Sequence, residues 1–380
     1  MMGSTASEKA SGVAAALWPD SVDVAWPALA CCCLPDQYRI MPHVIPFHIP
    51  GFERHFTPYD FTLAPSPLDC ADWFARFCNR VGEAIGRRYL PVCRMADGEY
   101  LLLFGQQAPS LRWQPWKRFL LLCRGAKLRV KARVKGFQSA TTQGVSSGHM
   151  TWNEWRSHRA TLSQAYQEIL SEGILAMHLG VSAIPWQEHY FPALGRWLGG
   201  AREVVAPHNY VPFYFVYALL RGSSRRDILA GSNVVVVHSA TAEKRTRIEA
   251  SLAREGVRCV QWLRISRSRS FEDALDLAAI HGTPDLCLIG AGVGKAAVIR
   301  QLKPVGVPCL DAGFIFEVWA EPDKQWERPM MTPDPDFDID KVRFLSEPAR
   351  HLLRACQAHD AAAAKASLRR LQRVHAIRFA

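Results

Sequence analysis

At 380 residues, 49% of them apolar and 21% charged, the chain has a globular composition and the length of two average domains or of one large α/β domain with appendages. It has no apolar run long enough to span a membrane and no signal-peptide pattern, and its 11 cysteines lie mostly in apolar runs, as buried thiols of a reducing compartment do. The formal net charge of +11 favours an anionic partner, which could be a phosphate-bearing ligand, an anionic membrane surface or nucleic acid. We therefore expect a cytoplasmic protein, with peripheral contact at the inner face of the membrane left open.

The chain begins with a segment of low periodicity, residues 1–60, which is rich in Pro, Ala, Cys and His and which we interpret as an accessory N-terminal segment. A helix is predicted over residues 66–88, because Ser66 can cap it and apolar side chains then recur at helical spacing. A strand ending at Met95, the turn Asp97-Gly98-Glu99 and a further helix are expected next.

Residues 127–135, KLRVKARVK, alternate basic and apolar side chains, which predicts a strand with one buried and one wholly basic face. The basic face is either a solvated edge that Lys and Arg protect from aggregation, or a docking surface for an anionic acceptor such as a lipid-linked diphosphate sugar. Residues 154–170 then predict a helix, and residues 173–180 a buried strand.

From Asn233 onward, short apolar strands alternate with helices. Strands are predicted over 233–239, 257–263, 285–292 and 307–313, and helices over 241–256, 270–281 and 294–302. This alternation is typical of a parallel sheet with right-handed crossovers. We predict an α/β fold, a Rossmann-like parallel sheet with helices on both faces, over residues 61–322, and a linker with a C-terminal helical tail over residues 323–380.

Parallel α/β sheets bind ligands beyond the carboxyl ends of their strands. Four segments fall at such ends: Asp97-Gly98-Glu99, His238-Ser239, Gly290-Ala291-Gly292 and Asp311-Ala312-Gly313. The glycine-rich segment fails the dinucleotide fingerprint, whose third glycine would be Lys295, and fails the P-loop pattern because Ala296 stands where Ser or Thr is required. It is either a phosphate-cradling turn or a tight turn of small residues.

The two carboxylates of the Asp97-Gly98-Glu99 turn also have two interpretations. As structural residues, Asp97 would cap the following helix and Glu99 would favour its first turn. As functional residues, they would offer hard oxygen ligands to Mg²⁺ or Mn²⁺, while Gly98 would let a phosphate approach the backbone closely.

The segment CRMADGEYLLLFG resembles the R-x-G-D-G-E segment of bacterial glycosyltransferases of the GT-D fold, with its D-x-E motif. Residues 285–320 resemble the closing signature of that family, in which an apolar strand, a Gly-rich turn, a helix and a strand ending in D-x-G follow one another. The resemblance implies a GT-D-type Rossmann-like fold that binds a nucleotide-diphosphate sugar with a divalent metal. Its implied donor-binding residues are Arg94, Asp97, Glu99, Gly290, Gly292 and Gly313, with Asp97 and Glu99 also holding the metal and Asp311 lining the same cleft. Gly98 and Ser239 join the donor-binding candidates because of their places at strand ends.

The sequence departs from the family pattern at two positions. Ala96 stands where the motif often has Gly, and Phe314 follows D-x-G where better-studied members have His. Glycosyl transfer needs a base for the acceptor hydroxyl, so the catalytic candidates are Glu317, Asp311 and His178, with His208 as a further histidine. A histidine near a strand end is otherwise a hydrogen-bonded structural residue.

The leading hypothesis is a metal-dependent glycosyltransferase that uses a nucleotide-diphosphate sugar, specifically a UDP-sugar, with Mn²⁺ or Mg²⁺ as cofactor. Its partners would be the donor and a polysaccharide, glycoconjugate or lipid-linked acceptor. The alternative is a basic, non-enzymatic α/β module that binds nucleic acid or another polyanion through residues 127–135. The sequence contains no helix-turn-helix, RNA-recognition or OB-type signature in its favour.

Overall fold

The computed structural model describes residues 43–49, 61–66, 68–95, 97–104, 137–138, 149–150, 152–177, 194, 197–198, 204–267, 269–322, 351, 354, 362–363 and 366. The predicted basic strand over 127–135 lies outside these residues, as does most of the predicted C-terminal helix; the isolated positions described from 351 onward are helical. None of the described helices is long and apolar enough to cross a membrane.

The fold is built on a seven-stranded sheet in which every strand pairing is parallel. Across the sheet the order is β7 (Tyr210–Pro212), β6 (Ile174–Met177), β3 (Leu90–Met95), β11 (Pro308–Asp311), β10 (Leu286–Gly290), β8 (Asn233–His238) and β9 (Arg258–Arg264). The predicted fold class, a Rossmann-like parallel sheet with helices on both faces, is confirmed.

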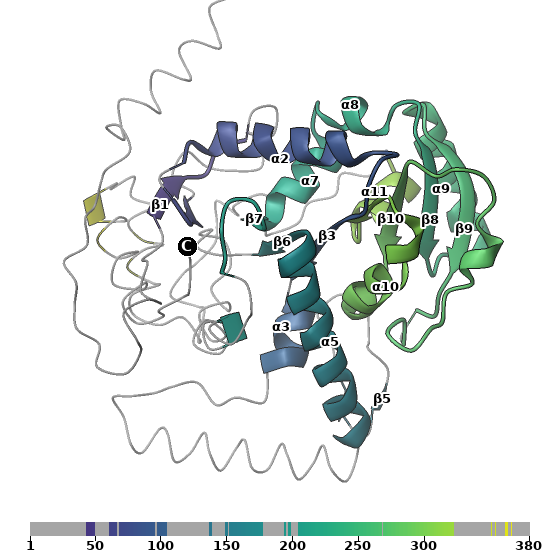
Figure 1. Ribbon diagram of the computed structural model, residues 1–380, viewed down its shortest axis with the longest axis horizontal. Coiled ribbons are helices and arrows are strands. Elements are labelled where there is room, and N and C mark those ends of the chain that lie inside the picture. The colour runs from purple at the N-terminus through teal and green to yellow at the C-terminus, as the bar shows by residue number, and fades with distance from the viewer. Residues whose placement is uncertain are drawn as a thin grey trace, which may run out of the picture.

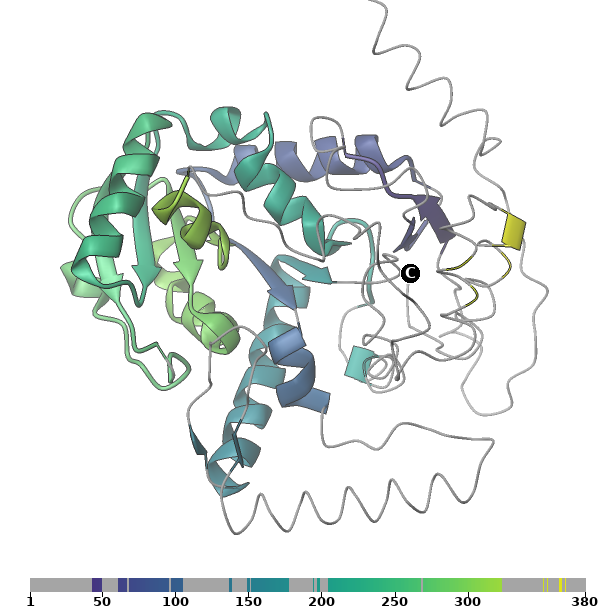
Figure 2. The ribbon, with the colours of Figure 1, turned by 180° about the vertical axis from the view of Figure 1, so that it is seen from behind.

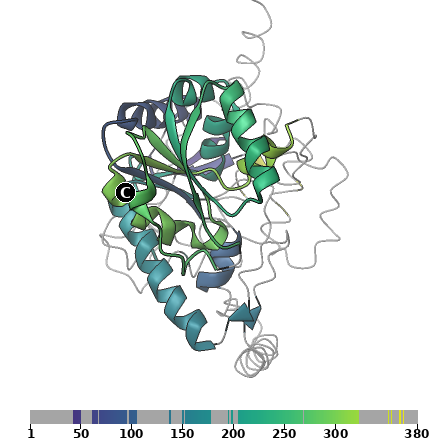
Figure 3. The ribbon, with the colours of Figure 1, turned by 90° about the vertical axis from the view of Figure 1, so that its right-hand side faces the viewer.

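The strands are apolar because helices cover both faces of the sheet, as expected for an all-parallel sheet. In β8, residues Val234 to Val237 are fully buried. One helical layer contains α2 (Cys70–Ala84), α7 (Phe213–Arg221), α8 (Arg225–Leu229), α9 (Ala242–Arg254) and α11 (Ile315–Ala320). The other contains α3 (Asp97–Phe104), α5 (Trp152–Glu172) and α10 (Lys295–Gln301), and the sheet lies between the two layers (Figures 1 and 3).

The order of the strands creates a seam between β3 and β11. The chain runs from β3 outward to β6 and β7, crosses to β8 and β9 at the other edge, and returns through β10 to β11 beside β3. Two small antiparallel sheets lie apart from this sheet: β1 (His43–Pro46) with β2 (Phe61–Ala64), and β4 (Phe137–Gln138) with β5 (His149–Met150). The view from behind shows α3 beside α5 below the sheet and α2 above it (Figure 2).

Two helix predictions differ from the structure. The helix α2 begins at Cys70, not near Ser66, because the side chain of Asp69 accepts hydrogen bonds from the backbone N–H groups of Ala71 and Asp72. The helix predicted over 270–281 is wrong: the segment contains only a short 3₁₀ turn, η4 (Leu277–Ala279). The Gln301 side chain bonds to backbone groups of this segment, which replaces intrahelical bonds.

The segment before residue 61, which we expected to be accessory, contributes to the core where it is described. Ile45, Phe47 and Ile49 are buried. The Phe47 ring packs edge-on against Tyr214 and lies 6.2 Å from Phe215, both in α7. These contacts fix part of the N-terminal segment to the helical layer that covers β3 and β6.

Candidate functional site

Four sequence segments meet at the carboxyl ends of adjacent strands. The strands β3, β11, β10 and β8 are neighbours in that order, and their registers align Asp311 with Ile289 and Gly290 with His238. The Gly-rich turn forms the 3₁₀ segment η5 (Gly292–Gly294) and leads directly into α10. The four segments that the sequence analysis singled out therefore lie together at the carboxyl ends of these strands, where parallel α/β sheets bind ligands.

Arg94 and Asp311 form a buried, bidentate ion pair across the β3–β11 seam. Nε of Arg94 donates to Oδ2 of Asp311 and Nη2 donates to Oδ1, both at 3.0 Å, and the Arg94 backbone N–H donates to Oδ2 at 3.2 Å. The side chains are 3% and 1% exposed. The guanidinium also lies over two rings of α7, with Cζ 5.1 Å from the centroid of Phe213 and 4.4 Å from that of Tyr217. Arg94 is thus fixed by its carboxylate partner and by two rings, while its buried Nη1 has no hydrogen-bond partner among the described residues.

Lys295 extends this pair into a larger group of charges. Its Nζ lies 2.8 Å from Oε1 of Glu99 and 3.5 Å from Oδ2 of Asp311. The side chains of Lys295 and Glu99 are 7% and 3% exposed. We call Arg94, Asp311, Lys295 and Glu99 the buried charge cluster; it joins β3, β11, α10 and α3.

Mutual attraction keeps the cluster charged despite its burial. Burial disfavours the ammonium of Lys295, but the carboxylates of Asp311 and Glu99 outweigh that effect and raise its pKa. Burial alone would raise the pKa of Asp311, yet Arg94 and Lys295 outweigh it and lower that pKa. Burial alone would lower the pKa of Arg94, but the carboxylate of Asp311 outweighs burial and raises it. The cluster therefore contains two cations and two anions, with formal charges that cancel.

Two of the predicted glycines are required by close contacts at this edge. A Cβ on Gly313 would lie 2.0 Å from Nη2 of Arg94, and the φ angle of Gly313 is +44°. A Cβ on Gly290 would lie 2.4 Å from the ring of His238 and 2.6 Å from that of Phe316. Both residues are glycines because the backbone must pass this close to neighbouring side chains.

His238 lies beside the cluster at the end of β8. It is 8% exposed, and among the described residues its Nδ1 has no hydrogen-bond partner. Burial, and then the nearby Lys244 ammonium, lower its pKa to about 4, so the ring is neutral at pH 7. Glu317 in α11 forms an ion pair with Lys244 and is 38% exposed, so it does not belong to the buried charge cluster.

The remaining residues predicted for the site lie at several different places in the fold. Gly98 is buried at the start of α3, and Gly292 has a φ of +54° in the Gly-rich turn. Ser239 follows β8 and is partly exposed. His178 lies outside the described residues. His208 is exposed and lies just before β7, at the amino ends of the parallel strands. The cluster lies at their carboxyl ends, on the opposite side of the sheet.

The described carboxylates of the site fit a divalent metal poorly. Glu99, the expected ligand, already contacts Lys295, and both oxygens of Asp311 accept hydrogen bonds from Arg94. No three His, Cys, Asp or Glu side chains in the described part of the chain are grouped to hold a metal ion. The backbone of Asp97 opens α3, while its side chain lies outside the described residues. A metal on Glu99 would have to share this carboxylate with the ammonium of Lys295, a like charge 2.8 Å from Oε1.

Sequence reasoning did not assign a role to Lys295, Phe213 or Tyr217. A signal for Lys295 was present: it is the only charged residue of the stretch GAGVGKAAVI, which directly follows a buried strand. A lysine buried at the start of such a helix needs a carboxylate partner. No comparable sign in the sequence indicated that Phe213 and Tyr217 stack on Arg94, because both lie more than 100 residues after Arg94 in the chain.

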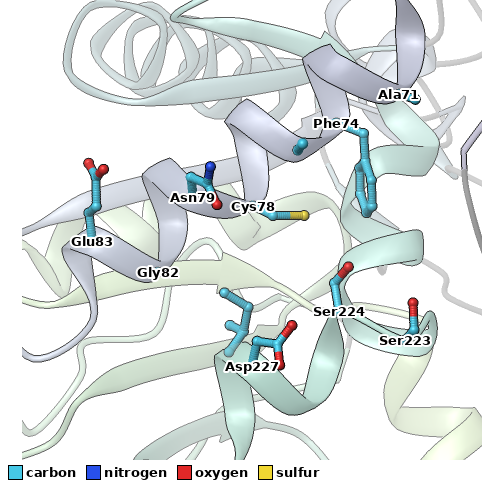
Figure 4. A pocket seen from close by; sticks show the side chains of 11 residues that line it. Ala71, Phe74, Cys78, Asn79, Gly82, Glu83, Ser223, Ser224 and Asp227 are labelled. Carbon is cyan, nitrogen blue, oxygen red and sulfur yellow. The ribbon is translucent and has the colours of Figure 1, made fainter.

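A second concave surface lies away from the cluster. A groove of about 540 Å³ runs between α2 and α8, and Cys78, Asn79, Ser224 and Asp227 point into it from its two walls (Figure 4). None of the residues that line it is basic, and two of them, Glu83 and Asp227, are acidic. The groove therefore lacks the cations that a phosphate-bearing ligand requires.

Comparison with known proteins finds a weak structural similarity. No protein-family model matches the chain, and no curated protein matches it either. Among solved structures, the chain is similar to a selenomethionine-substituted structure of a domain of unknown function, DUF1792. The TM-score is 0.34 and the sequence identity 14%, over 67% of this chain and 88% of the other.

Proposed function

We propose that the chain is a glycosyltransferase that takes its sugar from a nucleotide-diphosphate sugar, specifically a UDP-sugar. The observation that supports this proposal is the convergence of three segments on the buried charge cluster: the Asp97-Gly98-Glu99 turn, the Gly-rich turn at Gly290 and the D-x-G turn at Asp311. These are the segments that resemble the GT-D glycosyltransferases. Their arrangement at one sheet edge matches what that resemblance implies.

In this proposal the diphosphate binds above the ends of β3, β11 and β10. Gly98 and Gly292 let the phosphates approach backbone N–H groups, and the start of α3 favours negative charge there. As the bond from sugar to phosphate breaks, negative charge develops on the diphosphate, and fixed cations stabilise it. Arg94 and Lys295 are the cations of the cluster.

The general base needs a carboxylate that the acceptor can reach. Asp311 was a candidate, but it is 1% exposed and both its oxygens hold Arg94, so in this proposal it positions Arg94. Glu317 is partly exposed and remains the proposed base; Lys244 orients its carboxylate. The expected Mn²⁺ or Mg²⁺ on Asp97 and Glu99 is not part of this mechanism, because the contacts of Glu99 do not fit it.

The acceptor is proposed to be a polysaccharide, a glycoconjugate or a lipid-linked sugar. The basic segment 127–135, which lies outside the described residues, would face an anionic membrane surface, in keeping with a peripheral cytoplasmic protein. The nucleic-acid alternative depends on the same segment and gains no further support.

The test is a thermal-shift titration of the full chain with UDP, GDP and NAD, followed by measurement of UDP release from a panel of UDP-sugars. A ligand that binds the native state raises the unfolding temperature according to its concentration relative to Kd. We expect UDP to stabilise the protein and NAD to have no effect. Asp227→Asn, in the α2–α8 groove, is the control and should respond to UDP as the wild type does. Equal stabilisation by NAD, or none by any nucleotide, would contradict the proposal.

A further inference from the structure

Lys295 occupies the position between two carboxylates at the proposed donor site. Its ammonium lies between two carboxylates that come from different parts of the chain, Glu99 in α3 and Asp311 in β11. Carboxylates from separate elements that converge on one point define a place for a cation. In this chain the side chain of Lys295 fills that place.

A divalent metal on Glu99 is difficult to reconcile with this arrangement. The ammonium of Lys295 lies 2.8 Å from Oε1 of Glu99, so a metal ion on this carboxylate would either compete for that oxygen or bind the other oxygen within a few ångströms of the ammonium. Two buried cations next to a metal ion would repel it strongly, since charges interact more strongly away from water.

The turn that carries Lys295 is held rigidly. The hydroxyl of Ser270 donates a hydrogen bond to the carbonyl oxygen of Ala291 at 2.5 Å. A Cβ on Gly294 would lie 2.3 Å from the oxygen of Ser270, so the turn packs tightly against this residue. Lys295 is the next residue and the first of α10. A cation on a fixed turn loses little conformational freedom when it meets an anion.

We propose that Lys295 is the cation that binds the diphosphate of the donor, in the place of a divalent metal, and that Glu99 positions it. An ammonium has three N–H donors; Glu99 lies at 2.8 Å and takes one, while Asp311 is an ion-pair neighbour at 3.5 Å, so at least one donor remains for a phosphate oxygen. Nucleotide-diphosphate binding then depends on Lys295 and needs neither Mn²⁺ nor Mg²⁺. This inference rests on the proposed function, because it concerns the same donor site.

The test measures the Kd of the full chain for UDP by titration calorimetry, once in EDTA and once with Mn²⁺. The main variant is the double substitution Glu99→Gln/Lys295→Met, which removes the ammonium without leaving a buried carboxylate unpaired. The control is Lys303→Met, since Lys303 forms a 2.7 Å pair with Glu172 but has a side chain that is 55% exposed.

We expect the wild type to bind UDP in EDTA with a Kd within about threefold of that in Mn²⁺. The double variant should bind at least about tenfold more weakly in EDTA, and Lys303→Met should bind as the wild type does. Glu99→Gln alone keeps the ammonium, for which Asp311 still compensates, so it should weaken binding less than the double variant. Circular dichroism of each variant checks that it is folded.

Three results would overturn the inference, and they differ in what they say about the proposed function. If UDP binds only with Mn²⁺ and Glu99→Gln alone abolishes that binding, Glu99 holds a metal, and the glycosyltransferase proposal survives without this inference. The same holds if the folded double variant binds UDP in EDTA as the wild type does. If no nucleotide binds the wild type in either condition, the proposed function fails and this inference with it.

Discussion

Replacing Asp311 by asparagine removes a carboxylate that contacts both cations of the buried charge cluster. In the wild type its two oxygens accept three hydrogen bonds from Arg94 and lie 3.5 Å from Lys295 at the nearest. Asparagine keeps the shape and one acceptor oxygen but not the charge. Arg94 would then be a cation that is 3% exposed and has lost its carboxylate partner.

The expected cost follows from that burial. Removing one partner of a buried ion pair typically destabilises a protein by about 3 to 5 kcal/mol, because the remaining charge stays desolvated. The contact of Lys295 with Glu99 survives the substitution, so we expect a value of about 3 kcal/mol, at the lower end. For a domain of this size that corresponds to a fall of roughly 6 to 12 °C in Tm.

Urea unfolding followed by circular dichroism measures this loss, with Glu172→Gln as the control at an exposed ion pair. The control should cost about 1 kcal/mol or less. The pKa of Asp311 is lower in the folded state, so its contribution is complete above the unfolded pKa of about 4 and disappears as the pH falls below it. The difference between wild type and variant should therefore be equal at pH 7 and pH 5.5 and shrink below about pH 4. If Asp311→Asn costs no more than Glu172→Gln, the cluster is not desolvated and the reasoning is refuted.

The buried, neutral ring of His238 and the backbone at Gly313 give two further predictions. The pKa of His238 falls from 6.5 in the unfolded chain to about 4 in the folded one, so stability should decrease by about 3 kcal/mol as the pH drops from 6.5 to 4. Urea unfolding at several pH values should show that slope in the wild type and not in His238→Gln; equal slopes would mean that the ring is hydrated. Gly313→Ala should destabilise the fold by roughly 1 to 3 kcal/mol more than Gly306→Ala, because both glycines have positive φ but only Gly313 would place a Cβ against Arg94. Similar losses for the two alanine variants would show that Arg94 can move away.

The sequence was sufficient to predict six of the seven strands of the sheet, all but β7, and the end of the sheet where the four singled-out segments meet. Apolar runs bounded by turns, such as 233–239 and 307–313, became β8 and β11 because a parallel sheet buries both faces of its strands. Because the carboxyl ends of parallel strands lie at the same end of a sheet, Asp311 could be placed near Gly290 before any side-chain contact was known. Strand position follows from local pattern, so it can be predicted from the chain alone.

The contacts within the site could not be predicted in the same way. Arg94 and Asp311 are 217 residues apart in the sequence, and their pairing depends on β3 and β11 being neighbours in the sheet. The metal expected on Glu99 stays a prediction from its local motif, and that motif gave no sign of the contact with Lys295, which arises from the packing of α3 beside the Gly-rich turn. The helix predicted over 270–281 failed for a related reason, since the side chain of Gln301 satisfies that backbone from a distant position.

The energetics of the buried charge cluster favour a functional explanation over a structural one. Well-packed apolar side chains in place of a buried ion pair often leave a protein as stable or more stable, because the desolvation of charges costs about as much as their attraction returns. Two buried ion pairs, one across the β3–β11 seam and one between α10 and α3, are therefore not needed to hold these elements together. In the proposed function a diphosphate needs fixed cations at these strand ends, and cations can be buried there only if carboxylates balance them before the ligand arrives. Asp311 and Glu99 provide that balance for Arg94 and Lys295, so a ligand with negative charge explains all four residues together.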